Sequence, residues 1–313
     1  MTHLYRLVAL LLAFHPAAVS AQDAAKLGAP VGKLAFTDIR SLTRTLADFG
    51  DKKAFVLVFT NTTCPLAQRY LPTLSMLEKD YRGKGVQFVA VNAAADDTVR
   101  AMATHALKYE VEFPTVKDFD GKAARALGVT RTPEAVVLDA DKKLRYRGRI
   151  DDQYRIGGTR KEPTTRDLKD AIDSVLAGKP VATAETEVDG CPIEFPKPRQ
   201  AKAVTFAEHV APVLKKHCWE CHQPGGSAPF ALTTAKQAGA RAEAVAEAVA
   251  TQRMPPWFAG HESIPLANRR VLTDAERETL ADRAATGAKA GDAAKAPAPP
   301  KPPEGKWRID PRR

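Results

Sequence analysis

The sequence is poor in the residues that would mark several protein classes. It has 313 residues but only 4 cysteines, 4 methionines and 3 tryptophans. So few cysteines exclude a small scaffold knit together by disulfide bonds, and so few methionines exclude a methionine-rich metal-handling chain. No uninterrupted apolar stretch reaches the roughly 18 residues that a membrane-spanning helix needs, so we expect no transmembrane segment.

What the chain does have is length and positive charge. With 44% hydrophobic residues it can bury a sizeable core, and its length predicts two domains. Its 47 lysines and arginines exceed its 37 aspartates and glutamates, which gives a net charge of +10. Such a charge admits a nucleic acid, an anionic membrane surface or an acidic protein as partner.

The N-terminus narrows these classes of partner. Arg6 precedes an apolar run over residues 7–14, and small residues follow at positions 19–21. This pattern is typical of a cleaved signal peptide over residues 1–21, because the apolar run is too short to anchor the chain in a membrane. We therefore expect a periplasmic or secreted protein, for which nucleic acid is not a partner and disulfides persist.

Residues 32–182 alternate short apolar strands with stretches of helical spacing. Strands are expected over residues 55–59, 86–91, 134–139 and 144–148, and helices over residues 66–81, 97–109 and from a Thr164/Asp167 capping box to Ala177. The order βαβαββα predicts an α/β domain with helices on both faces of its sheet.

A linker that carries Cys191, over residues 183–203, leads to a region without strand patterns. Residues 204–292 predict a small all-α domain, with helices expected from Thr205, over the alanine-rich residues 234–252, and from a Thr273/Glu276 capping box. Residues 293–313 are rich in proline, alanine and lysine, and this composition predicts a disordered tail.

The sharpest motif is Cys-Trp-Glu-Cys-His at residues 218–222. Cys218 and Cys221 are spaced to bond covalently to the two vinyl groups of one haem c, and the adjacent His222 can then bind the iron. A redox-active dithiol, half of a zinc site and a structural disulfide are the alternatives. A redox dithiol would follow a strand rather than a helix, and a zinc site would need further ligands nearby.

A second axial ligand would come from elsewhere in the same domain. Met254 is its only methionine, and the prolines at 255 and 256 would hold it in an extended loop. The competing candidates are three histidines, His209, His217 and His261. Pro229 lies where its carbonyl could accept the Nδ1 proton of His222 and so orient that ring.

Residues 205–292 resemble the small monohaem cytochrome c domains of exported bacterial proteins. The CWECH motif carries the resemblance, together with a Gly-Gly-Ser-Ala-Pro loop at residues 225–229 and a Met-Pro-Pro-Trp loop at residues 254–257. The resemblance implies His222 and Met254 as the two axial ligands of the haem iron.

Cys64 lies between the strand expected at residues 55–59 and the helix that follows it. A helix N-terminus stabilises a thiolate, so Cys64 is a candidate nucleophile, and a buried unreactive cysteine is the alternative. Thr132 and Pro133 immediately precede a strand, and their bond is a candidate cis peptide that would place the Thr132 backbone beside Cys64.

This arrangement resembles the thioredoxin-like superfamily, in its redoxin branch of alkyl hydroperoxide reductases and thiol-specific antioxidant proteins. The resemblance implies that Cys64 attacks a disulfide or a peroxide and that Thr132 and Pro133 shape substrate docking. Two positions depart from the family pattern. Ala67 stands where a thioredoxin has its second cysteine, and Asn61 stands where a peroxiredoxin has threonine or serine.

Cys191 is left over once two cysteines are assigned to haem and Cys64 to the first domain. The segment that carries it could fold back over Cys64, either as a resolving thiol or as half of a structural disulfide. Because 191 − 64 = 127 residues would lie in the closed loop, such a bond would stabilise the fold by about 4 to 5 kcal/mol in the chain-entropy model.

As a whole, the chain resembles exported bacterial fusions of a redoxin with a cytochrome c. This resemblance implies an oxidoreductase that couples thiol chemistry to one-electron transfer through haem c. It also implies a redox partner protein, acidic in view of the basic charge, and a peroxide or protein disulfide as substrate. The alternative is a non-catalytic electron-transfer protein whose thioredoxin-like half only docks a partner.

Overall fold

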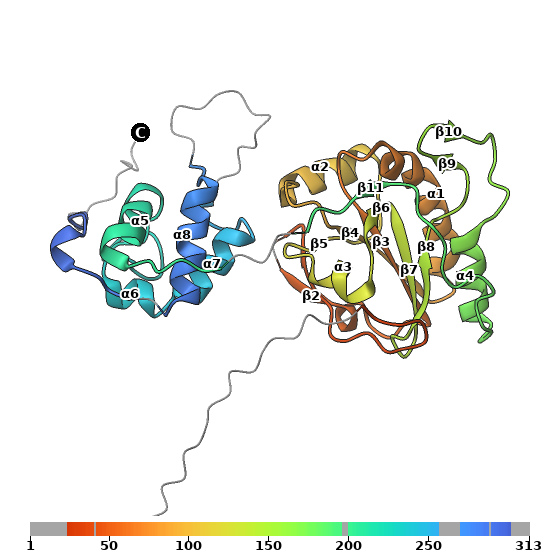
Figure 1. The fold of residues 1–313 in the computed structure, drawn as a ribbon, viewed down its shortest axis with the longest axis horizontal. Helices are drawn as coiled ribbons and strands as arrows, with labels where there is room; N and C mark the ends of the chain where they lie inside the picture. The colour runs from red at the N-terminus through yellow and green to blue at the C-terminus, as the bar shows by residue number, and fades with distance from the viewer. Residues whose placement is uncertain (1–23, 41, 196–199, 257–269, 288, 302–313) are drawn as a thin grey trace, which may run out of the picture.

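The computed structural model describes residues 24–301 except residues 41, 196–199, 257–269 and 288 (Figure 1). The predicted signal peptide, the competing ligand His261 and the end of the predicted tail therefore lie outside the described residues. Within the described ranges, no helix has both the length and the apolar character needed to cross a membrane.

The first half is built on a seven-stranded sheet with the strand order β2-β1-β5-β4-β3-β7-β8 (Figure 1). The strands β3, β4 and β5 are parallel, whereas β7 runs antiparallel to β3 and forms a hairpin with β8. Their bounds are β1 (Ala35–Asp38), β2 (Thr43–Thr45), β3 (Ala54–Thr60), β4 (Val86–Asn92), β5 (Thr115–Lys117), β7 (Glu134–Asp139) and β8 (Leu144–Gly148).

Helices cover both faces of this sheet, as the sequence predicts. Because successive side chains of a strand point to opposite faces, Phe55, Leu57 and Phe59 of β3 pack in the cluster that includes α3. Val56 and Val58 pack in the cluster that includes α1 and α4. The helices are η1 (Leu46–Phe49), α1 (Pro65–Arg82), α2 (Val99–Lys108), α3 (Lys122–Leu127) and α4 (Asp167–Leu176).

The predicted capping box of the last helix in this half is wrong. The backbone N–H of Thr164 donates to the buried carboxylate of Asp152 at 2.7 Å, and its hydroxyl donates to the same group. The helix α4 therefore begins only at Asp167. A threonine caps a helix when its side-chain oxygen accepts a hydrogen bond from a backbone N–H of the first turn. The side chain of Thr164 is instead bound to the carboxylate of Asp152, outside the helix.

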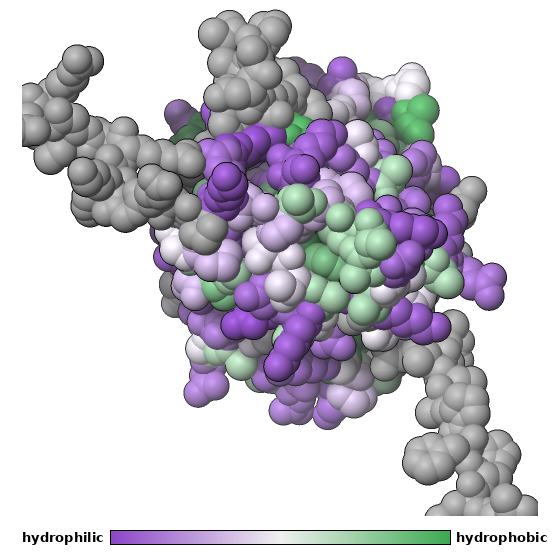
Figure 2. Space-filling model, turned by 90° about the vertical axis from the view of Figure 1, so that its left-hand side faces the viewer, coloured by the Kyte–Doolittle hydropathy of each residue, from purple (hydrophilic) through white to green (hydrophobic). Residues whose placement is uncertain are grey.

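The second half contains helices and no strand among its described residues. The helices are η2 (Phe206–Val210), α5 (Ala211–His217), α6 (Ala235–Gly239), α7 (Ala242–Ala250), α8 (Asp274–Ala285) and η3 (Ala293–Lys295). One apolar cluster, which includes Phe206, Leu214, Trp219 and Leu280, joins all of these helices except η3. Figure 2 looks onto this half, where a hydrophobic area near the middle of the face is surrounded by mostly hydrophilic residues.

The alanine-rich helix predicted over residues 234–252 is in fact two helices. The chain turns after Gly239, a weak helix former, and Arg241 leaves the helical conformation. The guanidinium of Arg241 stacks 4.5 Å from the ring centre of Phe230, a contact that fixes the break. The turn at η3 falls within the segment predicted to be disordered, and there Lys295 forms an ion pair of 2.6 Å with Glu208.

Glu276 ties the start of α8 to the end of α5. The capping box predicted for Thr273 and Glu276 is confirmed. The Glu276 carboxylate also lies 2.9 Å from Nζ of Lys216 and 3.1 Å from Nε2 of His217. Burial tends to raise the pKa of Glu276, but the hydrogen bonds from Thr273, Lys216 and His217 outweigh it and lower this pKa to about 2.

We expect Glu276→Gln to destabilise the second half at pH 7 by about 1 to 2 kcal/mol, since the carboxylate keeps part of its solvent contact. A depressed pKa stabilises the fold above the unfolded value of 4.5 and loses that effect as the pH falls toward 2. The difference from wild type should therefore shrink by more than half at pH 3.

Denaturant unfolding followed by tryptophan fluorescence measures this effect, because all three tryptophans lie after residue 204. The matched control is Glu278→Gln, which removes the same charge from an exposed position of the same helix. Equal losses of stability for the two variants, or a difference that does not change with pH, would contradict the role given to Glu276.

Candidate functional site

Cys64 lies where β3 ends and α1 begins, at the N-cap of that helix. The bond between Thr132 and Pro133 is cis, and Sγ of Cys64 lies 3.3 Å from the carbonyl O of Thr132. The predicted neighbours Cys64, Thr132 and Pro133 are thus brought together. Cys64 is only 1% exposed, which means that another part of the chain covers it.

Asn61 holds the Cys64 loop to the strand that carries Thr132. Its Oδ1 accepts hydrogen bonds from the backbone N–H of Cys64 at 2.6 Å and of Thr63 at 3.2 Å. Its Nδ2 donates to Oγ1 of Thr132 at 3.1 Å. In the sequence Asn61 stands out only as a departure from the peroxiredoxin pattern, whereas in the structure its side-chain amide positions the Cys64 loop.

A second network of hydrogen bonds, centred on the buried Asp97, also holds the Cys64 loop. The Asp97 carboxylate accepts from the Thr62 backbone at 2.7 Å, from the Thr62 hydroxyl, and from Nδ2 of Asn92 at 2.6 Å. Lys117 donates to Oδ1 of Asn92 at 2.8 Å, and burial lowers the pKa of Lys117 to about 8. Nothing in the sequence revealed this network, because Asp97 was placed at the start of the second helix.

Residues 184–195, here called the strap, cover Cys64. Within the strap, β11 (Cys191–Pro192) pairs antiparallel with β6 (Arg131–Thr132), so that Cys191 is opposite Thr132. The Sγ atoms of Cys191 and Cys64 are 2.8 Å apart. The predicted return of Cys191 over Cys64 is confirmed, and the first part of the predicted linker is held on the first half.

Both ends of the strap are anchored. At its start, the backbone of Arg147 in β8 bonds with Ala184 and with Thr186 at 3.0 and 3.2 Å. Toward its end, the backbone N–H of Ile193 donates to the carbonyl of Thr130 at 2.8 Å. Phe195 packs against the apolar cluster that includes α3. Secondary-structure patterns could not reveal this segment because it pairs through isolated contacts far apart in sequence.

The two sulfur atoms of the pair differ in acidity. Burial tends to raise the pKa of Cys64, but hydrogen bonds from the Cys191 thiol and from the backbone N–H groups of Ala67, Cys191 and Leu66 outweigh it and lower the pKa. Burial and the neighbouring Cys64 thiol raise the pKa of Cys191 to about 11, against a smaller opposite effect of Arg131. Of the two thiols in the reduced pair, Cys64 is therefore the first to ionise.

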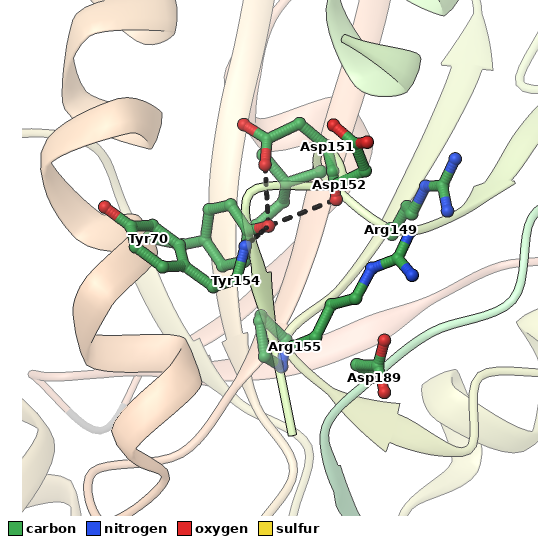
Figure 3. Close-up of a pocket in the computed structure, with 9 residues that line it drawn as sticks. Tyr70, Arg149, Asp151, Asp152, Tyr154, Arg155 and Asp189 are labelled. Atoms are coloured by element: carbon green, nitrogen blue, oxygen red, sulfur yellow. Dashed lines mark hydrogen bonds between the residues drawn. The ribbon is translucent and has the colours of Figure 1, made fainter. Parts of the chain in front are cut away.

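A small polar pocket adjoins the pair and is lined in part by Pro133 and by Asp189 of the strap (Figure 3). Within it, the hydroxyl of Tyr70 donates to the Asp151 carboxylate at 2.7 Å and accepts from the backbone N–H of Tyr154 at 3.2 Å. Burial raises the pKa of Asp151 despite the hydrogen bond from Tyr70. The ring of Tyr154 lies against that of Tyr70. Tyr154 also packs against the small apolar cluster formed by Cys64, Leu66 and Ala67.

In the second half, the CWECH motif forms a tight turn directly after α5. The backbone N–H of His222 donates to the carbonyl of Cys218 at 2.9 Å. Nδ1 of His222 lies 3.0 Å from the carbonyl O of Phe230, so the acceptor is one residue beyond the predicted Pro229. This contact orients the imidazole and leaves its Nε2 to bind an iron.

The motif packs closely against the glycine-rich loop that follows it. A Cβ atom on Gly226 would lie 2.2 Å from the carbonyl O of Cys221, so only glycine fits there. The ring of Phe230 lies 4.6 Å from that of His222, and Trp219 is buried with its Nε1 donating to Leu232 at 2.9 Å. These contacts fix the turn that carries Cys218, Cys221 and His222.

The properties of Cys218 bear on the alternatives to haem. Burial, and the nearby Cys221, raise the pKa of Cys218 to about 11, so Cys218 itself is not activated as a nucleophile. Within the described ranges, no three His, Cys, Asp or Glu side chains are grouped to hold a metal ion. A haem needs fewer protein ligands because its ring supplies four nitrogens, and the residues present fit it on the His222 side.

The second axial ligand is not brought to His222 by any contact between described residues. Met254 is 40% exposed, precedes a cis peptide bond to Pro255, and is anchored through its backbone N–H to Ala248 at 3.0 Å. Two of the competing histidines already have partners: His217 contacts Glu276, and Nδ1 of His209 lies 3.1 Å from the backbone N of Thr205. Met254 stays a prediction.

Comparisons with known proteins agree with the geometry around Cys64. The Redoxin family model matches residues 28–164. The thiol-disulfide oxidoreductase ResA of Bacillus cereus is 28% identical over 125 residues, which are 40% of this chain and 70% of that protein. ResA of Geobacillus thermodenitrificans is 25% identical over 124 residues, again 40% and 70% of the two chains.

Solved structures give the same fold for the first half. A hypothetical protein of Sinorhizobium meliloti has a TM-score of 0.51 and 29% identity, and the match covers 56% of this chain and 98% of that one. An uncharacterized conserved protein of Geobacillus kaustophilus has a TM-score of 0.51 and 28% identity over 56% and 94%. The first half therefore has the thioredoxin-like α/β fold and is similar to redoxins.

Proposed function

We propose that this chain is an exported thiol-disulfide oxidoreductase that also carries one covalent haem c. The observation that supports it most is the juxtaposition of Cys64 with Cys191, two thiols 2.8 Å apart and of opposite pKa shift. The pair forms a disulfide when oxidised and exchanges it with the thiols of a redox partner protein. The signal peptide predicted over residues 1–21 would deliver it to the periplasm or the exterior.

Exchange with a disulfide suits the site better than reduction of a peroxide. Asn61 occupies the position of the threonine or serine that a peroxiredoxin carries, and it is committed to the Cys64 loop and Thr132. ResA, the relative named above, is itself a thiol-disulfide oxidoreductase. Cys191 supplies the second sulfur that a thioredoxin would carry at the position of Ala67.

In the second half, Cys218 and Cys221 would bond to the haem and His222 would bind its iron, with Met254 proposed as the other axial ligand. A haem held there would supply one-electron transfer to and from another carrier. The Phe230 carbonyl would hold the imidazole of His222 in one orientation. The net charge of +10 favours an acidic partner.

Three measurements on the wild-type protein test both parts. Alkylation followed by mass mapping should find Cys64 and Cys191 free after reduction and protected after oxidation, and the protein should catalyse thiol exchange with a model disulfide. A pyridine haemochrome spectrum should show haem that stays on the denatured chain. A Cys64–Cys191 disulfide that resists mild reductant would instead favour the non-catalytic docking protein, and absence of covalent haem would refute the second part.

A further inference from the structure

The two sulfur atoms of the pair differ sharply in their access to solvent. Cys64 is 1% exposed and packs in a small apolar cluster with Leu66 and Ala67, beneath the strap. Cys191 lies on the strap itself and is only partly buried. An attacking thiolate must reach a disulfide sulfur on the side opposite the sulfur that leaves, so access decides which of the two is attacked.

We propose that a partner thiol attacks Cys191 and that Cys64 is the sulfur released. This inference deepens the proposed function and rests on it. It reverses the roles implied by the resemblance to thioredoxin-like proteins, in which Cys64 would meet the substrate. The partner is a protein dithiol, and its first covalent bond to this chain forms on the strap.

The exchange balances in two steps. In the first, a partner thiolate forms a bond to Sγ of Cys191, the Cys64–Cys191 bond breaks, and its electron pair leaves on Sγ of Cys64. In the second, the other partner thiolate attacks its own bound sulfur and releases Cys191, which takes up a proton. The partner dithiol becomes a disulfide, and the pair in this chain gains two electrons.

The acidity of the two thiols supports these roles. A thiol of low pKa is the better leaving group, and a thiolate favoured in the reduced protein makes its disulfide a better oxidant. The pKa of Cys64 is lowered by its hydrogen bonds, whereas that of Cys191 is raised to about 11. Release of Cys64 is therefore easier than release of Cys191.

The docking of the strap depends on a glycine. A Cβ atom on Gly190 would lie 2.3 Å from the carbonyl O of Thr132, a backbone atom that cannot rotate away. Arg131 reinforces the contact by donating from Nη1 to the carbonyl O of Gly190 at 2.8 Å. Any side chain at position 190 must therefore lift the strap and uncover Cys64.

Glutathione serves as the probe thiol. The oxidised full-length protein is mixed with reduced glutathione, quenched with acid within the first turnover, and mapped by mass spectrometry. We expect at least a tenfold excess of glutathione on Cys191 over Cys64. In urea the strap is undone, and both adducts should appear. An excess on Cys64 in the native protein would overturn the inference while leaving the proposed function intact. A disulfide that forms no adduct would refute both.

A pair of glycine variants gives an independent measurement. In the reduced protein, Gly190→Ala should raise the alkylation rate of Cys64 at least tenfold. Gly158→Ala is the control, because a Cβ atom there has no neighbour within 4 Å, and it should leave the rate unchanged. Equal rates in the wild type and Gly190→Ala would mean that the strap does not restrict access to Cys64, which contradicts the inference.

Discussion

Replacing Cys64 with serine is expected to abolish catalysed thiol exchange. A hydroxyl cannot form a disulfide, and the Cys191 thiol that is left, whose pKa is raised by burial, is mostly protonated at pH 7. We therefore expect a loss of roughly a hundredfold or more, down to the rate without protein. The measurement is turnover of a model disulfide with dithiothreitol as reductant.

The same substitution has a second consequence, for stability. An oxidised wild-type protein closes a loop of 127 residues, and Cys64→Ser removes a stabilisation of about 4 to 5 kcal/mol in the chain-entropy model. Under reducing conditions the two proteins should unfold at similar denaturant concentrations. This comparison separates a catalytic defect from misfolding, and a Cys64→Ser protein that keeps full exchange activity would refute the proposed chemistry.

Local sequence patterns predicted those elements that are determined by residues close together in the sequence. The strand β3 is buried along its whole length and reads as one apolar run, AFVLVFT. The capping box of Thr273 and Glu276 depends on residues three apart. In each case the chemistry is complete within a few neighbouring residues, which is why the sequence alone revealed it.

Features that depend on distant partners could not be predicted. The short strands β1, β2 and β5 and the helix α3 are held by the sheet rather than by strong patterns of their own. Asn61 acquires its role only because Thr132, 71 residues later, lies within reach of its amide. The strap was predicted only through its cysteine, because a Gly-Cys-Pro stretch shows no periodicity.

Replacing both Cys218 and Cys221 with serine should remove covalent haem completely. The haemochrome signal on the denatured chain should fall to background, because each thioether bond needs a cysteine sulfur and the double variant has none in this motif. Each single variant should keep one bond and a reduced yield. The matched comparison is the Cys64→Ser protein, which should keep its full haem content.

The double variant also tests whether thiol exchange in the first half depends on haem attachment in the second half. The site around Cys64 is built from residues 61–195, and the contacts described above for it lie within the first half. Exchange activity with small thiols should therefore stay within about twofold of wild type, since the remote substitutions leave every one of these contacts in place. A large loss of exchange in the double variant would mean that haem attachment is required for the thiol site itself. Covalent haem that persists in it would show that the attachment site lies outside the CWECH motif.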